Sequence, residues 1–75
     1  MKISQENIDK LKDKLPLKMM SDIANETGSP YSTVRDALTV YRPGGHKRSI
    51  NRKAKIYSKA IELLNARGIS TDDLT

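Results

Sequence analysis

Apolar residues recur at helical spacing in four stretches of the chain, separated by proline and glycine. In the first stretch, Ile8, Leu11 and Leu15 follow one another at intervals of three and four, and Pro16 ends the run. Because this spacing places side chains on one face of an α-helix, it predicts a helix over about residues 5–14. Ser4 stands directly before this helix and is expected to be its N-cap.

A second helix is predicted over about residues 19–27. Its inward-facing residues are Met19, Met20, Ile23 and Ala24. Gly28 follows at the position where a left-handed backbone is usual, and its missing Cβ removes the steric penalty of that conformation. The pattern therefore predicts a sharp turn at Gly28.

A third helix is predicted over about residues 30–41. Ser29 is its expected N-cap, and Pro30 takes the first helical position, where a missing N–H has no cost. The inward residues of this helix are Val34, Ala37, Leu38 and Tyr41.

A proline and two glycines break the third helix, and residues 43–49 are predicted to form a basic loop. A short hairpin that pairs residues 40–42 with residues 46–50 is the alternative. A fourth helix is predicted over about residues 51–67. Its apolar residues form two neighbouring rows, Ile50, Ala54, Tyr57, Ile61 and Leu64 in one and Ile56, Ala60 and Leu63 in the other.

These elements predict an all-α fold of four helices, with one domain over residues 1–68 and a short tail over residues 69–75. Seventy-five residues are too few to enclose a deep substrate cavity. The absence of cysteine excludes disulfides and thiolate zinc sites, and one histidine, His46, favours neither a metal site nor acid–base catalysis. We expect no enzymatic activity, no metal and no cofactor. No segment has the hydrophobicity of a signal peptide or a membrane span, so a cytoplasmic protein without membrane contact is expected.

Charge changes this picture because it is concentrated in one segment. The chain has 14 lysines and arginines against 9 aspartates and glutamates. Residues 1–41 carry six basic and six acidic side chains, whereas residues 42–59 carry seven basic side chains and no acidic one. Such a block favours a polyanionic partner, and a solvated surface is the alternative.

The segment between the second and third helices combines the residue types that a helix-turn-helix requires. Ala24, four residues before Gly28, lets the two helices cross closely, and Gly28 supplies the positive φ of a short turn. Ile23 and Val34 are placed to lock the helices where they cross. The predicted core of the motif is Ile23, Ala24, Gly28, Val34 and Leu38.

Residues 22–28 read Asp-Ile-Ala-Asn-Glu-Thr-Gly, and residues 31–34 read Tyr-Ser-Thr-Val. This pattern resembles the DNA-binding head of lactose-repressor-type bacterial regulators, which commonly reads D-V/I-A-x-x-A-G-V-S-x-x-T-V. The resemblance covers about residues 19–68 and implies DNA binding by a helix-turn-helix.

Three residues depart from the family pattern: Ser29 replaces an apolar residue, Pro30 a serine, and Asp36 a frequent arginine. The additional first helix is similar to that of small phage repressors of the Cro and lambda kind. No effector-binding domain follows, so the resemblance implies no small-molecule effector.

If the third helix enters the major groove, its outward side chains meet base edges. The predicted base contacts are Tyr31, Ser32, Arg35, Asp36 and Thr39. Arg35 is suited to guanine O6 and N7, and Asp36 to the amino group of cytosine. The alternative is that these side chains are simply solvated.

Phosphate contacts are predicted around the third helix, in the basic loop and on one stripe of the fourth helix. These residues are Ser29, Thr33, Arg42, His46, Lys47, Arg48, Arg52 and Lys55. A solvated helix face and an incidentally charged loop are the alternatives.

The apolar arc of the fourth helix is wider than one packing contact requires, which predicts a homodimer or higher homo-oligomer. The predicted interface residues are Ile56, Tyr57, Ala60, Leu63 and Leu64. The alternative is that the first helix covers this arc within one chain.

Together these features predict a sequence-reading, double-stranded DNA-binding protein, a small transcriptional regulator of a bacterium, phage or mobile element. It is expected in the cytoplasm, associated with the nucleoid, or in the host cytoplasm if a phage encodes it. The alternatives are a helix-turn-helix that binds a protein of the transcription machinery and a non-specific architectural DNA-binding protein.

Overall fold

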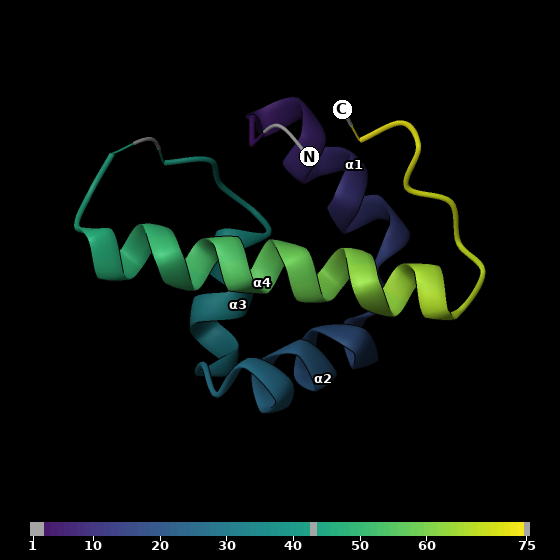
Figure 1. Cartoon of the computed structure of the whole chain (residues 1–75), viewed down its shortest axis with the longest axis horizontal. Helices are drawn as coiled ribbons and strands as arrows, with labels where there is room; N and C mark the ends of the chain where they lie inside the picture. The colour runs from purple at the N-terminus through teal and green to yellow at the C-terminus, as the bar shows by residue number, and fades with distance from the viewer. Residues whose placement is uncertain (1–2, 43, 75) are drawn as a thin grey trace.

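The computed structural model describes residues 3–42 and 44–74, which form four α-helices and no strand. The helices are α1 (Gln5–Lys14), α2 (Leu17–Thr27), α3 (Tyr31–Ala37) and α4 (Lys47–Ala66). The long α4 contacts the other three, with α1 on one side and α2 and α3 on the other (Figure 1). The predicted all-α fold of four helices is confirmed, and the alternative hairpin is absent from the described residues.

Local capping sets the start of α1 and the end of α2, as predicted. The Ser4 hydroxyl accepts a hydrogen bond from the Asn7 N–H at 3.2 Å. At the end of α2, Gly28 has φ 69°, and its N–H and that of Ser29 both donate to the Ala24 carbonyl. These two hydrogen bonds satisfy a backbone carbonyl in the last turn of α2 that would otherwise lack a donor. The left-handed Gly28 then turns the chain away from the axis of α2.

The start of α2 differs from the prediction by two residues. The helix begins at Leu17, directly after extended Pro16, rather than at Met19. Leu17 is 74% exposed, so the first turn forms before the buried face of the helix begins. The apolar pattern marks only the packed part of a helix, which explains the difference.

The start of α3 also differs. Pro30 has extended backbone (φ −60°, ψ 146°) and precedes the helix, which begins at Tyr31. Ser29 is buried in the turn and makes no side-chain cap, so the predicted N-cap role of Ser29 is wrong. The backbone N–H of Ser29 closes the end of α2 instead, because the turn is only three residues long.

The end of α3 lies four residues earlier than predicted, at Ala37. The Thr39 hydroxyl donates to the Arg35 carbonyl at 2.6 Å, and this local bond competes with continued helix. The side chain of Gln5 then accepts from the Tyr41 N–H at 2.8 Å and donates to the Thr39 carbonyl at 3.1 Å. The chain therefore leaves the helix and is bound to the first residue of α1, and Tyr41 is 36% exposed rather than inward.

The start of α4 lies four residues earlier than predicted, at Lys47, and its end lies at Ala66. His46 precedes the helix without a side-chain cap, and its carbonyl accepts from the Ile50 N–H at 3.0 Å. Lysine and arginine are good helix formers, so the helix extends through residues that were predicted to be loop. Among the described residues, no helix is long and apolar enough to cross a bilayer.

One hydrophobic core joins all four helices. Ile8 and Leu11 of α1 and Ile23 of α2 are fully buried in it with Ile56 and Leu64 of α4. The Tyr57 hydroxyl donates to the Ala37 carbonyl at 2.9 Å, which ties the end of α3 to α4. Burial raises the pKa of Tyr57, and the negative charge of Asp36 raises it further.

The predicted oligomer interface coincides with this core. Ile56, Tyr57, Ala60 and Leu64 are each at most 4% exposed within a single chain, and Leu63 packs partly buried against the same cluster. The first four side chains have no surface to offer a partner, so their assignment to an interface is wrong. The alternative, in which α1 packs against α4 within one chain, is observed.

The residues after α4 are packed against the first helix (Figure 1). Leu74 is buried in the core, and Lys14 forms an ion pair with Asp73 at 3.1 Å. The Lys10 ammonium also donates to the Asp73 carbonyl at 3.4 Å. The hydrogen bond from Lys14 lowers the pKa of Asp73. The predicted tail is thus part of the packed structure.

Candidate nucleic-acid interface

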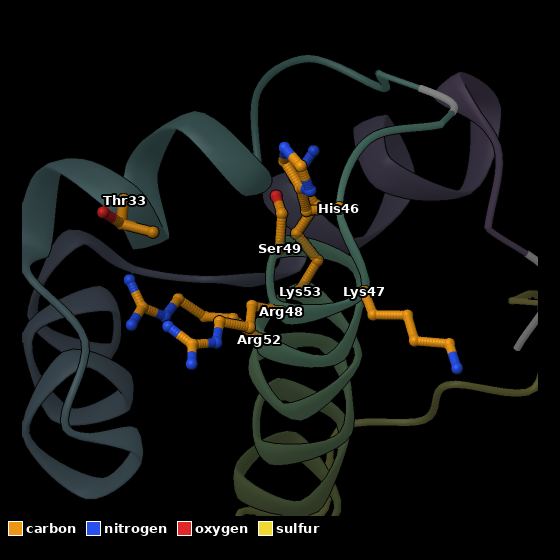
Figure 2. A pocket seen from close by; sticks show the side chains of 7 residues that line it. All are labelled: Thr33, His46, Lys47, Arg48, Ser49, Arg52 and Lys53. Carbon is orange, nitrogen blue, oxygen red and sulfur yellow. The ribbon is translucent and has the colours of Figure 1, made fainter.

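The first half of α4 extends beyond the core and forms a basic groove with α3. This groove has a volume of about 690 Å³ and is lined by Thr33, His46, Lys47, Arg48, Ser49, Arg52 and Lys53. Figure 2 shows that Arg48 and Arg52 point toward the side on which Thr33 lies, whereas Lys47 points away. We call this surface the α3–α4 groove.

The α3–α4 groove continues across the face of α3. Ser32, Thr33 and Asp36 line this continuation with Ser49 and Lys53 of α4. Residues 42, 44 and 45 form its third wall, and both glycines have positive φ, 88° and 102°. A polar ridge of α3 and the first turns of α4 therefore face the same space.

The groove also extends in the other direction, over the turn between α2 and α3. Arg48, Asn51, Arg52 and Lys55 lie opposite the turn residues Thr27, Gly28 and Ser29. The result is a continuous cationic track along one side of α4, which passes both the turn and α3.

Few carboxylates oppose this track. The four ion pairs among the described residues do not involve Arg48, Arg52, Lys53 or Lys55. In addition, Lys47 and Arg48 occupy the first turn of α4, where the helix dipole disfavours positive charge. Positive charge at this helix end is locally unfavourable, and such departures from local rules are expected at functional sites.

The structure separates the predicted base contacts into two groups. Ser32 and Asp36 face the α3–α4 groove, whereas Tyr31 and Arg35 are exposed outside the grooves described above. Thr39 lies beyond the end of α3, and its hydroxyl is bonded to Arg35. Its placement on a recognition helix is therefore wrong, because the helix ends before it.

The predicted phosphate contacts are also divided. Arg48, Arg52 and Lys55 lie on the cationic track with Thr33 and His46 near them. Ser29 is only 8% exposed but lines the part of the groove over the turn, so its phosphate contact stays a prediction. Lys47 is exposed but points away from the rest of the groove (Figure 2), because the early start of α4 places it on another helix face.

Arg42 has a different partner from the one predicted. Its guanidinium pairs with the Asp36 carboxylate at 2.6 Å, across the wall of the groove. Both side chains remain accessible, at 60% for Arg42 and 44% for Asp36. The only carboxylate that lines the two grooves of α3 is thereby neutralised.

Three lining residues of α4 were not predicted as contacts from the sequence: Ser49, Asn51 and Lys53. Ser49 was predicted to be loop and becomes helical because α4 begins at Lys47. Gln5 was also missed, because its bonds to residues 39 and 41 join positions more than 30 residues apart. Among the described residues, no cluster of His, Cys, Asp or Glu is suited to hold a metal ion.

Comparison of the chain with protein-family models, curated proteins and solved structures found no match. The resemblance of residues 19–68 to lactose-repressor-type heads stays a prediction from the motif.

Proposed function

We propose that this protein binds double-stranded DNA and reads its sequence, with α3 in the major groove and the cationic track of α4 on the phosphates. The observation that carries the proposal is the α3–α4 groove. It joins the polar ridge of α3 to Arg48, Arg52 and Lys53, none of which has a carboxylate partner among the described residues.

The arrangement supports this function on physical grounds. Phosphate contacts supply sequence-independent affinity and fix the orientation of a DNA-binding protein, while side chains on an inserted helix discriminate bases. Here the two kinds of surface lie next to each other and are carried by helices that share one core. We propose the role of a small transcriptional regulator of a bacterium, phage or mobile element, in the cytoplasm.

The first test is selection of binding sites from a random duplex pool. An enriched motif is expected, and two-fold symmetry in it would indicate a homodimer with two α3 helices about 34 Å apart. Retention of the pool without a motif would instead indicate an architectural DNA-binding protein. If no DNA is retained at low salt, the proposal is wrong. That result would favour the alternative, in which the helix-turn-helix binds a protein.

The second test measures how the affinity depends on salt. If Arg48, Arg52, Lys53 and Lys55 each neutralise one phosphate, the slope of log K against log salt is about four times −0.9, or about −3.6. Arg52→Gln should reduce this slope by about 0.9. The matched control is Lys12→Gln, which removes one exposed cation from α1, on the other side of α4 (Figure 1). Equal slopes for the two variants would contradict the placement of DNA in the groove.

A further inference from the structure

The ion pair between Asp36 and Arg42 lies on the surface that the proposed function directs toward DNA bases. Asp36 is on the exposed ridge of α3, one turn after Ser32, and Arg42 comes from the segment that follows α3. We propose that the two side chains act as one unit that recognises a C·G base pair in the major groove. This inference rests on the proposed function.

Base-pair chemistry favours this assignment. In the major groove, the C·G pair presents the cytosine N4 amino donor beside the two adjacent acceptors of guanine, O6 and N7. The ion pair presents a carboxylate acceptor beside a guanidinium donor, joined at 2.6 Å between Asp36 Oδ2 and Arg42 Nη1. Asp36 accepts from cytosine, and Arg42 donates to the guanine of the same pair. The A·T pair offers no two adjacent acceptors for the guanidinium.

The pair keeps enough free hydrogen-bonding capacity for this role. One guanidinium N–H is used in the bond between the two side chains, and an arginine carries five. The Asp36 side chain is 44% exposed and the Arg42 side chain 60% exposed. Both can therefore keep their mutual bond while they contact a base pair.

The backbone around Arg42 is held in position before DNA binds. Gln5 accepts from the Tyr41 N–H at 2.8 Å and donates to the Thr39 carbonyl at 3.1 Å. These bonds fasten the segment before Arg42 to α1. A positioned guanidinium loses less conformational freedom on binding than one on a free loop.

The assignment also changes the expected role of Arg42. As a phosphate contact, Arg42 would affect all DNA sequences alike, and Asp36 would repel the backbone nearby. As a unit, the pair is neutral toward phosphates and selective toward bases. Substitution of either residue should therefore change sequence preference more than affinity for random DNA.

The test is site selection from a random duplex pool with the wild-type chain and with Asp36→Asn and Arg42→Gln. The wild-type motif should contain a C·G pair at one position of each site. Asp36→Asn should replace this pair by A·T, because asparagine bonds adenine N6 and N7. Arg42→Gln should reduce discrimination at the same position by about 5- to 150-fold. The double variant should lose little more discrimination than either single variant.

Matched controls remove the same charges elsewhere. Asp13→Asn removes an exposed carboxylate of α1, and Arg67→Gln removes an exposed cation beyond the end of α4. Exposed ion pairs contribute little to folding, so all variants should retain the helix content of the wild type in circular dichroism.

Two results would overturn the inference. In the first, the wild type enriches a motif, but Asp36→Asn and Arg42→Gln shift affinity for all sequences equally, as their controls do. The proposed sequence-specific DNA binding would then be retained, and the Asp36–Arg42 pair would affect only the electrostatic affinity for DNA. In the second, the wild type enriches no motif, which removes sequence reading itself and the inference with it.

Discussion

The hydrogen bond between Tyr57 and Ala37 holds the end of α3 against α4, and its removal by Tyr57→Phe has a calculable effect. The Ala37 carbonyl is the last of α3, and the two following amides that could reach it donate to other acceptors. The Val40 N–H donates to the Asp36 backbone carbonyl at 3.1 Å, and the Tyr41 N–H donates to the Gln5 side chain at 2.8 Å. Phenylalanine therefore leaves this carbonyl without its partner in the described structure.

The size of the effect follows from burial. Tyr57 is 4% exposed, so the bond lies in the core, and loss of one partner of a buried hydrogen bond costs about 1–3 kcal/mol. A domain of this length has a free energy of unfolding of about 4–11 kcal/mol at 0.05–0.15 kcal/mol per residue. A loss of 1 kcal/mol lowers the Tm of a domain of this size by about 4–8 °C, so the Tm of Tyr57→Phe should fall by at least about 4 °C.

Urea and thermal unfolding, followed by circular dichroism, measure this loss. The matched control is Tyr31→Phe, because Tyr31 is 40% exposed and its hydroxyl has no partner among the described residues. The control should change the free energy of unfolding by less than about 0.5 kcal/mol. If both variants are equally stable, the bond to Ala37 does not hold α3, and the reasoning is refuted.

The pH dependence gives an independent check of the same bond. Because burial raises the folded pKa of Tyr57, the unfolded chain loses this proton first as pH rises above the unfolded value of 10.0. The contribution of Tyr57 is therefore complete below that pH and is lost as pH rises through the folded pKa. The stability difference between wild type and Tyr57→Phe should narrow in alkaline solution, and a constant difference would contradict the assignment.

Substitutions at three further positions test the elements around the site. Gln5→Ala should speed amide hydrogen exchange at Tyr41 by about fivefold, the equivalent of about 1 kcal/mol, and unchanged exchange would show that the segment is held by other contacts. Gly28→Ala should lower the free energy of unfolding by about 1–2 kcal/mol in urea, since alanine at φ 69° is strained, whereas Gly28→Asn should lose less. Leu74→Ala should cost about 2–3 kcal/mol but leave DNA affinity unchanged, and equal stability would mean that the residues after α4 do not support the core.

Much of the fold was predictable because it depends on local chemistry. The spacing of Ile8 and Leu11, the Ser4 cap and the left-handed Gly28 act within a few residues of chain. The structure confirms each of these predictions. They determine where α1 begins, where α2 ends and which faces of the two helices are buried.

The candidate site was predictable in kind but not in arrangement. The block of cations in residues 42–59 is visible in the sequence, and most of its members lie near the α3–α4 groove. The partner of Arg42 was not visible, because its bond to Asp36 depends on where α3 ends. Four of the five predicted interface residues were wrong for the same kind of reason, since only the packing of α1 and α2 against α4 shows that these side chains are covered.

The helix faces, the sharp turn and the location of the positive charge follow from the sequence alone. The end of α3 and the pairing of Asp36 with Arg42 depend on tertiary structure. The two groups of features differ because the interactions that set them act over different distances along the chain. Caps, turns and periodicity join near neighbours, whereas Gln5 with Tyr41 and Tyr57 with Ala37 join residues 36 and 20 positions apart. Such bonds form only when the core brings distant segments together. At the end of a helix they can outweigh the small helix propensities of single residues.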